Sequence, residues 1–435
     1  MNGRLNLFQS AMLHWRDLAP YNAVHVARID EPLDRDRLQQ AIDATLAAYG
    51  VAGFELDRAS ERFTYHGGAM RAAIDMISAG DDAEATLAAE IEARLNADYP
   101  VTGRYEPWKF FAIEMTNAFH LGVGYDHVVA AGDSISVLLL RIVIRYRAGA
   151  ESARFAPPDL YPATYGPILR KRRRELLGGL IRGLPRLPAM IASLRRAFRP
   201  QFPYGDHQAN GFALVRVSPE RATAMRRAAK AWGITRNDLM LALTMRMLSE
   251  PAAGRHAARR RRELAVASIV NIRGDCGDEA ADAFGQFLSS FLVTHPVPPT
   301  VGLETLAREL GERTTRMKRD KLYLLTLPAM AIGGRVVRSI APGDRARFYR
   351  KSYPVWGGMT PLDVDLLWAS AGGQGPPPDY ARGVSTGPHT PLVVAMTSAA
   401  GGLNIGLTYR TAAWNRSDIA KMTAVLTAGI AELPP

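Results

Sequence analysis

The stretch "GYDHVVAAGDS", residues 124–134, places one histidine between a strand-like run and a helix-like run. Before it, "KFFAIEMTNAFHLGVGYDH" (109–127) predicts two strands joined by a turn. In the second strand, the period of two places Leu121, Val123, Tyr125 and His127 on one side. After it, "SISVLLLRIVIRY" (134–146) is apolar nearly all round, as expected of a helix buried between layers. His127 is therefore predicted to end a strand, beside a glycine turn where backbone and ligand can approach closely.

Helices and strands alternate in both halves of the 435-residue chain. The predicted elements outside the histidine stretch include amphipathic helices at 33–50, 81–98 and 417–433, a helix capped near Thr235 or Asn237, a strand at 263–273 and a hairpin at 391–410. Gly50 is predicted to stop the first of these helices. The fold class is therefore predicted as α/β (α+β) with mixed sheets. A chain of this length predicts two lobes. We divide it into an N-terminal lobe at 1–165, a connection rich in Pro, Gly and Arg at 166–205, and a C-terminal lobe at 206–435.

The composition indicates the cellular compartment and excludes some kinds of site. A single cysteine, Cys276, excludes an internal disulfide, and no paired metal-ligand spacing is present, so no metal site is predicted. A reducing cytoplasm is the expected location, with membrane association as an alternative. The N-terminus has no apolar core of signal-peptide type. No apolar run reaches the roughly 18 residues that span a bilayer.

The net charge of +12 is concentrated in residues 170–200, which hold ten Arg and Lys residues against one acid. Three interpretations stay open for this segment. It could be a solvated basic loop, or short amphipathic helices on an anionic membrane, since leucines alternate with the arginines and Pro185 and Pro188 divide the run. It could also recognise an acidic carrier protein or the phosphates of coenzyme A. Nucleic acid is not expected, because aromatic residues are almost absent between the charges.

Few familiar catalytic motifs are present. "GVSTG" (383–387) matches the GxSxG pattern of a nucleophile elbow, but that turn must lead into a helix and prolines follow at once. A nucleophilic Ser385 is therefore not expected. His127 has two interpretations from the residues alone: a histidine satisfied in the core, or a proton acceptor with a pKa near neutrality.

The chain resembles a known superfamily in several stretches that keep their order over roughly 400 residues. The stretch around His127 resembles the HHxxxDG motif of condensation domains and coenzyme A-dependent acyltransferases, which include chloramphenicol acetyltransferase, nonribosomal peptide condensation domains, alcohol acyltransferases and wax ester synthases. Further similar stretches are the opening "FQSAMLHWRDLAP" (8–20), "TRNDLMLALTMRML" (235–248), "SIVNIRG" (268–274), "AFGQFLSS" (283–290) and "YPVWGGMTPLDV" (353–364).

The resemblance implies a fold and a reaction. The fold would be two chloramphenicol acetyltransferase-like lobes in a V, each a mixed sheet with helices, with a tunnel between them. The reaction would move an acyl group from a coenzyme A or phosphopantetheinyl carrier-protein thioester to an alcohol or amine, forming an ester or amide. His127 would be the general base, with no acyl-enzyme and no permanently bound cofactor. The expected partners are a small-molecule or lipid acceptor and an acyl or peptidyl carrier protein, with anionic membrane contact through 170–200.

The motif departs from the family at one position. The family's aspartate falls on Ala131, its glycine on Gly132, and its first histidine on Asp126. Asp133 lies two residues late, where it could restore the family's contact with an arginine or cap the following helix, and the cap is the simpler interpretation. Arg273, which matches the arginine of the family's "VNLR" strand, would then lose its partner. The alternative function is therefore a catalytically inactive binding or scaffold protein.

The remaining candidates are tied to the expected tunnel. Tyr125 shares the strand face of His127 and is expected to line the tunnel, and Asp126 could orient the imidazole, although neighbouring strand residues point to opposite faces. Trp356 and Gly357 are expected in the tunnel wall or in plain packing. Hydroxyls that could stabilise an oxyanion are those of Ser385 and Thr386, with a structural role as the alternative.

Overall fold

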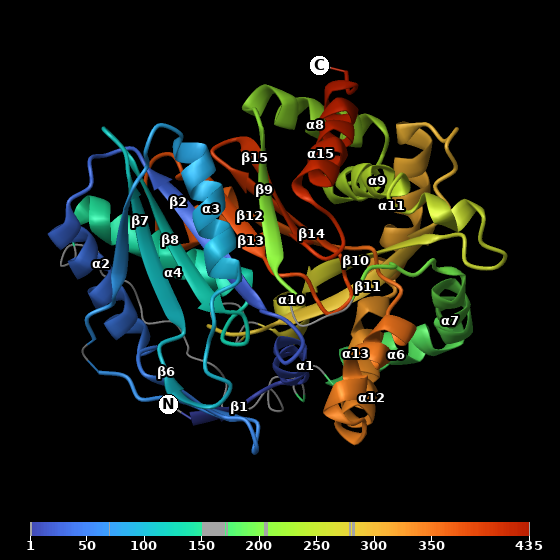
Figure 1. The fold of residues 1–435 in the computed structure, drawn as a ribbon, viewed down its shortest axis with the longest axis horizontal. Helices are drawn as coiled ribbons and strands as arrows, with labels where there is room; N and C mark the ends of the chain where they lie inside the picture. The colour runs from blue at the N-terminus through green and yellow to red at the C-terminus, as the bar shows by residue number, and fades with distance from the viewer. Residues whose placement is uncertain are drawn as a thin grey trace.

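Two large mixed sheets stand side by side, and each carries its own helices (Figure 1). The computed structural model describes residues 2–68, 70–149, 170, 173–203, 208–277, 280 and 283–434. The predicted lobe boundary at 165 and residues 166–169, 171, 172, 204 and 205 of the predicted connection lie outside the described residues. The α/β class and the two lobes are confirmed.

The N-terminal lobe is built on a five-stranded sheet in the order β13-β2-β8-β7-β5, with a small four-stranded sheet, β1-β4-β3-β6, beside it. The strands are β13 (Tyr380–Val384), β2 (Asn22–Ile29), β8 (Phe119–Asp126), β7 (Trp108–Glu114), β5 (Ile74–Ser78), β1 (Asn2–Arg4), β4 (Arg62–Tyr65), β3 (Phe54–Asp57) and β6 (Gly103–Tyr105). Its helices are α1 (Leu7–Arg16), α2 (Arg35–Tyr49), α3 (Ala83–Leu95) and α4 (Gly132–Ala148). Helix α2 ends where Gly50 adopts φ 63°, which confirms the predicted stop.

The C-terminal lobe is built on a six-stranded sheet in the order β11-β10-β12-β14-β15-β9. The strands are β11 (Leu288–His295), β10 (Leu264–Asn271), β12 (Gly357–Asp363), β14 (Leu392–Ala399), β15 (Gly402–Arg410) and β9 (Asn210–Val217). The helices in the second half are α8 (Pro219–Ala231), α9 (Arg236–Ser249), α10 (Arg273–Cys276), α11 (Leu303–Arg319), α12 (Thr326–Ser339), α13 (Pro342–Ser352), α14 (Val364–Ser370) and α15 (Arg416–Ala431), with 3-10 turns η2 (Ala253–His256) and η4 (Leu322–Leu325). Helix α9 begins at the predicted cap, Thr235.

One strand crosses between the lobes. After β12 the chain leaves the C-terminal sheet, α14 packs against α4, and β13 pairs antiparallel with β2 at the edge of the N-terminal sheet. The chain then returns to the C-terminal sheet as β14, parallel to β12. Residues 364–384 are thereby part of the N-terminal lobe's packing, although in the sequence they follow β9 to β12 of the other lobe. The two lobes are joined by this strand exchange as well as by the connecting segment.

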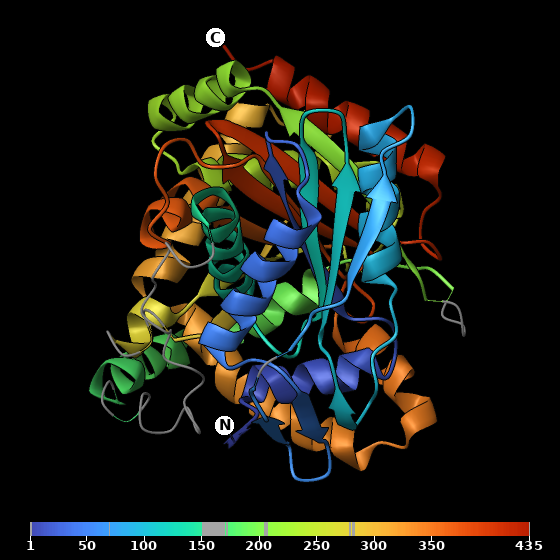
Figure 2. The ribbon, with the colours of Figure 1, turned by 90° about the vertical axis from the view of Figure 1, so that its left-hand side faces the viewer.

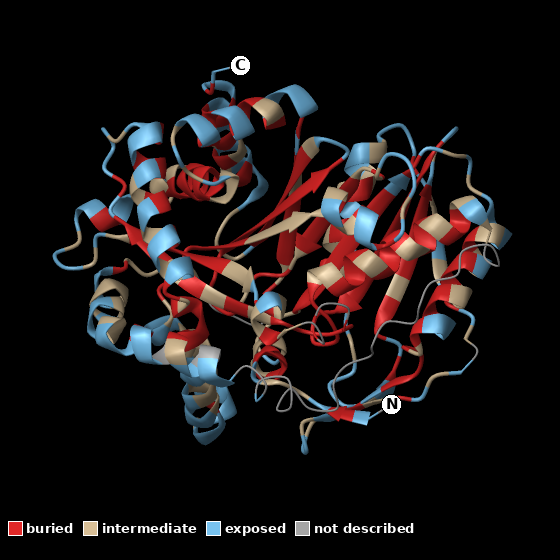
Figure 3. Ribbon diagram, turned by 180° about the vertical axis from the view of Figure 1, so that it is seen from behind, coloured by how far each residue is buried: buried red, intermediate tan, exposed pale blue. Residues whose placement is uncertain are grey.

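Figure 2 shows the molecule from the side of the N-terminal lobe, and Figure 3 shows that strands and helices differ in burial. The strands are largely buried, and helix α4 is buried on nearly every side, as its apolar sequence predicts. Helices α12, α13 and α7 (Leu187–Arg196) are far more exposed: α13 and α7 contain no buried residue and α12 contains one, Val337.

The basic segment forms two helices where the structure describes it. Helix α6 (Arg173–Gly183) and α7 are separated by the 3-10 turn η1 (Leu184–Arg186), which contains Pro185, as the two prolines predict. Several of its apolar side chains are exposed, namely Leu177, Ile181, Leu184 and Ile191. Of the described helices, none is long and apolar enough to cross a membrane.

Candidate active site

The loop after β8 carries His127 and is held by groups from both lobes. The backbone N–H of His127 donates to the Tyr21 carbonyl (3.4 Å), and the His127 carbonyl accepts a hydrogen bond from Gln286 Nε2 at 2.6 Å. Gln9 Nε2 donates to the Val128 carbonyl (2.9 Å). Strand β8 ends at Asp126, one residue earlier than predicted, so His127 is the first residue of the loop.

The imidazole of His127 has one nitrogen bound and one available. Nδ1 lies 3.3 Å from the Ala130 carbonyl oxygen, which can only accept, so Nδ1 carries the proton and Nε2 keeps its lone pair. The ring stacks on Tyr21 and meets Tyr125 edge to face, with centroids 5.5 and 5.8 Å apart. Burial lowers the pKa of His127 to about 4, so the ring is neutral at pH 7.

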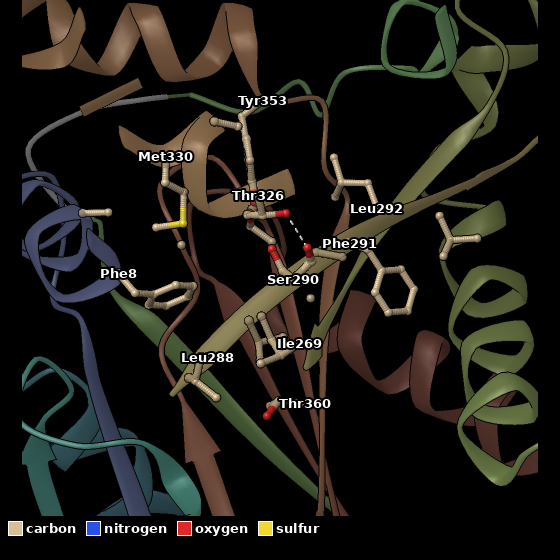
Figure 4. Close-up of a pocket in the computed structure, with 18 of the residues that line it drawn as sticks. Phe8, Ile269, Leu288, Ser290, Phe291, Leu292, Thr326, Met330, Tyr353 and Thr360 are labelled. Carbon is tan, nitrogen blue, oxygen red and sulfur yellow. Dashed lines mark hydrogen bonds between the residues drawn. The ribbon is translucent and has the colours of Figure 1, made fainter. Parts of the chain in front are cut away.

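His127 lines a cavity of about 1390 Å³ whose wall comes from both lobes. Tyr21, His25 and Tyr125 contribute from the N-terminal lobe, and β10, β11 and β12 contribute from the C-terminal lobe. Figure 4 shows a mainly apolar part of the wall, lined by Ile269, Leu288, Phe291 and Met330 from the C-terminal half and by Phe8 of α1 from the N-terminal lobe. Thr326 donates a hydrogen bond there to the Ser290 carbonyl (2.5 Å). The space is large enough for a long apolar group. His127 lies between the lobes, as expected, whereas a tunnel that opens to solvent at both ends stays a prediction.

Asp126 does not orient the imidazole. Its carboxylate is fully buried on the other side of the strand, where it pairs with Arg16 and accepts a hydrogen bond from Tyr105 (2.6 Å). It also accepts the backbone N–H of Val128 at 3.2 Å. The reason is the alternation of side chains at the end of β8. Asp126 therefore fixes the loop rather than the ring, and the interpretation that it contacts His127 is wrong.

Asp133 pairs with Arg273 and is not the N-cap residue of the helix, although its Oδ1 accepts the first-turn N–H of Ser134 (2.9 Å). Helix α4 has Ala131 as its N-cap, without a side-chain cap bond. The Asp133 carboxylate instead accepts from Arg273 Nε at 2.5 Å and from Asn271 Nδ2 at 2.8 Å. The predicted loss of a partner for Arg273 is also wrong, because the start of α4 places the Asp133 carboxylate, two residues after Ala131, within reach of the same arginine.

Arg273 ties the histidine loop to the opposite lobe. Its Nη2 donates to Ser134 Oγ (2.6 Å) and its Nη1 to the Ala280 carbonyl (2.7 Å) and the Ala283 carbonyl. The guanidinium lies over the Phe287 ring at 4.5 Å. The Ala131 N–H donates to the Gly285 carbonyl (3.0 Å), so the start of α4 and the "FGQ" segment are in direct contact.

Trp356 and Gly357 face away from the cavity. Trp356 Nε1 donates to the Phe198 carbonyl (2.9 Å), and the two rings stack with centroids 5.9 Å apart. Along β12 the residues alternate, so Gly358 and Thr360 line the cavity while Gly357 faces Leu248 in the core. Packing, the plainer alternative, is what the structure shows for Trp356 and Gly357.

Ser385 and Thr386 make structural bonds. Ser385 lines the cavity, but its Oγ accepts the Asn22 N–H (3.0 Å) and donates to the Leu95 carbonyl (3.4 Å). Thr386 does not line the cavity, is fully buried and lies within 3.5 Å of Asn210 Oδ1. No helix follows this turn, because the chain continues into β14, which agrees with the rejection of a nucleophile elbow. The oxyanion interpretation is not supported for either hydroxyl.

The structure adds residues that the sequence reasoning did not single out. Gln9 and Gln286 hold the histidine loop, and both lie in stretches that resemble the superfamily, so the resemblance contains a signal for these two residues. Arg16 also lies in the opening stretch, and Tyr21 directly follows it. Arg382 lines the cavity from the crossing strand β13, and nothing in the local sequence predicts that strand's place.

The comparisons with known proteins support the fold. No protein-family profile and no curated protein matches the chain by sequence. By structure, the chain is similar to the first condensation domain of the calcium-dependent antibiotic synthetase, with a TM-score of 0.71, 16% identity, and coverage of 100% of this chain and 96% of that chain.

Two further solved structures are similar over nearly the whole chain. The EpoB cyclization-docking bidomain from Sorangium cellulosum has a TM-score of 0.69 at 14% identity, covering 99% of this chain and 84% of that chain. The condensation domain of the Monacolin K polyketide synthase MokA has a TM-score of 0.65 at 12% identity, covering 100% and 98%. The protein therefore has the two-lobed condensation-domain fold, and the resemblance found in the sequence is confirmed at the level of fold.

Proposed function

We propose that this protein is an acyltransferase that moves an acyl group from a thioester to an alcohol or amine, with His127 as the general base. The observation that carries the proposal is how the two imidazole nitrogens are hydrogen-bonded. Nδ1 is committed to the Ala130 carbonyl, and Nε2 is left with a lone pair on the wall of a cavity built by both lobes. A neutral, positioned imidazole is the group that proton abstraction from a hydroxyl or amine requires.

The chemical step follows from this tautomer. Nε2 takes the proton of the acceptor as its oxygen or nitrogen attacks the thioester carbonyl carbon. The carbon–sulfur bond then breaks, and the imidazolium returns the proton to the departing thiolate, so His127 ends the cycle neutral. The Ala130 carbonyl, which accepts from Nδ1, stabilises the transient imidazolium. The low pKa of His127 makes it a weak base, so alignment of the two reactants in the cavity must supply much of the acceleration.

The Asp133–Arg273 pair favours an active acyltransferase over a catalytically inactive binding or scaffold protein. Inactivity was inferred from the lack of a carboxylate at position 131. Arg273 receives its carboxylate from Asp133, and both residues bond to the start of the helix that follows the histidine loop. The loop geometry that the family motif supports is thus supported here by a different residue.

The apolar wall supports an acyl donor with a hydrocarbon chain. Leu288, Leu292, Met330 and Val337 lie on β11 and α12, and apolar residues of α7 complete this side. We propose coenzyme A or a phosphopantetheinyl carrier protein as the donor, with a small-molecule or lipid acceptor. The exposed apolar residues of α6 and α7, interleaved with arginines, favour peripheral contact with an anionic membrane.

The decisive experiment compares two histidine variants. His127→Ala is expected to lower thiol release from acyl thioesters, offered with alcohol and amine acceptors, by roughly 10² to 10⁴-fold. His120→Ala is the matched control: His120 is also buried, lies on β8, the strand that leads to His127, does not line the cavity, and makes no hydrogen bond to a described residue. Turnover at the wild-type rate in His127→Ala would remove His127 from the mechanism. No turnover in wild type with any thioester would favour the scaffold alternative.

A further inference from the structure

Arg382 is a buried cation without a carboxylate partner. It lies on β13, only 2% of it is exposed, and it lines the cavity. Its Nε donates to Thr397 Oγ1 (2.9 Å), and its Nη2 donates to the carbonyls of Met396 (2.9 Å) and Thr360. All three acceptors are neutral. Among the described residues, none accepts a hydrogen bond from Nη1.

The nearest acid is already engaged. Asp133 is close enough to act on Arg382 through space, but its carboxylate is paired with Arg273. Burial lowers the pKa of Arg382 to about 10, so the side chain still carries its charge at neutral pH. A buried charge without a counter-ion is costly, and its retention calls for a compensating anion.

The free end of Arg382 lies beside the start of helix α4. A Cβ placed on Gly132 would lie 3.3 Å from Arg382 Nη1 and 3.4 Å from His25 Cε1, closer than most side-chain contacts, so the lack of a side chain at position 132 lets the guanidinium lie against the start of α4. Gly132 is the first residue of α4, and neither its N–H nor that of Asp133 donates to a described residue. Free N–H groups at a helix N-terminus attract negative charge. Two independent groups, Nη1 and the helix end, thus meet at one part of the cavity.

We infer that Arg382 Nη1 and the N-terminus of α4 bind a free carboxylate carried by the substrate. This inference deepens the proposed function, on which it rests, by naming a substrate class: an acceptor or an acyl chain that bears an acid group. The rest of the substrate would occupy the apolar part of the cavity. The carboxylate would supply the counter-ion that the described residues do not provide.

Equilibrium binding tests the site without turnover, so it does not depend on the proposed reaction. Hexanoate and hexanamide have nearly the same size but differ in charge. Titration calorimetry at pH 7.5 and matched ionic strength is expected to show that the wild-type protein binds hexanoate at least about tenfold more tightly, as a charge-assisted contact predicts. Equal affinity for the two ligands in wild type would overturn the inference.

Variants test whether Arg382 and the start of α4 cause the preference for hexanoate over hexanamide. Arg382→Gln is expected to abolish it, whereas Arg28→Gln, which removes a half-exposed arginine paired with Asp30, should leave it unchanged. Gly132→Ala fills the space beside Nη1 and is expected to weaken hexanoate more than hexanamide. This variant keeps the test valid if Arg382→Gln does not fold. Retention of the full preference in a folded Arg382→Gln, or its equal loss in Arg28→Gln, would place the anion elsewhere.

Turnover then separates the two sources of the carboxylate. Acceptors are offered as an amino acid and its amide with hexanoyl thioester, and donors as a half-thioester of a dicarboxylic acid and its uncharged analogue with one acceptor. A preference for the acid form that disappears in Arg382→Gln identifies the partner that carries the carboxylate. If Arg382 served only the oxyanion of the reacting carbonyl, Arg382→Gln would lower turnover of acid and amide equally, and the calorimetric preference would be absent.

Discussion

Removing the charge of Asp133 should weaken the junction between the lobes. Asp133 and Arg273 come from opposite lobes, and their side chains are only 15% and 12% exposed. Asp133→Asn keeps the shape of the side chain but leaves Arg273 without an acid. The start of α4, which follows the His127 loop, would lose the charged contact that joins it to the C-terminal lobe.

The expected loss in the free energy of unfolding depends on the contacts that Arg273 keeps in Asp133→Asn. Breaking a fully buried ion pair from one side costs about 3–5 kcal/mol, since the remaining charge is uncompensated. Arg273 keeps its bonds to Ser134, Ala280 and Ala283 and some contact with water, so the expected loss is smaller, about 2 kcal/mol in the free energy of unfolding. Asp30→Asn is the matched control: Asp30 and Arg28 are 74% and 45% exposed, and the expected change is below about 0.5 kcal/mol.

Urea unfolding followed by tryptophan fluorescence measures both variants. We expect a lower midpoint for Asp133→Asn and an unchanged midpoint for Asp30→Asn, with similar slopes for both. A midpoint for Asp133→Asn equal to that of wild type would refute the view that this pair stabilises the lobe junction. Equal losses in both variants would show an effect of net charge instead.

Three further predictions follow from the site and its surroundings. Ala131→Asp, which rebuilds the family motif, should destabilise the protein by about 2 kcal/mol, because position 131 is buried and Arg273 already has its acid; urea unfolding with an unchanged midpoint would contradict this. The acid limb of kcat/KM should lie near pH 4, because the pKa of His127 in the folded protein is about 4. The same lowered pKa makes stability depend on pH: the free energy of unfolding should fall as pH drops from about 6.5 to about 4, because the unfolded chain binds more protons in this range. An acid limb near 6.5 would count against His127 as the base. Anionic liposomes should sediment the protein at low salt and release it as salt rises, and Ile181→Ser should weaken this; equal recovery on neutral vesicles would exclude membrane contact through α6.

The local elements were predictable because they depend on neighbours in the chain. The helix that ends at Gly50 and the hairpin at 391–410 are short-range patterns of polarity and glycine, and both formed where they were expected. The position of His127 at the end of a strand was also a local property. The resemblance in "FQ", "NIRG" and "FGQ" indicated the whole fold, although it did not say what these residues contact.

The site itself depended on distances that the sequence does not encode locally. Asp133 replaces the family's aspartate because the packing of the start of α4 against the other lobe, and not a count of residues, decides which carboxylate reaches Arg273. Arg382 reaches the cavity through a strand that crosses to the other lobe's sheet, and its pairing with β2 joins residues more than 350 positions apart. Side-chain alternation along β12 and β8 turned Trp356 and Asp126 away from the cavity. Local pattern predicts elements, whereas the neighbours of a charge or a ring depend on how those elements pack, and only the tertiary structure contains that arrangement.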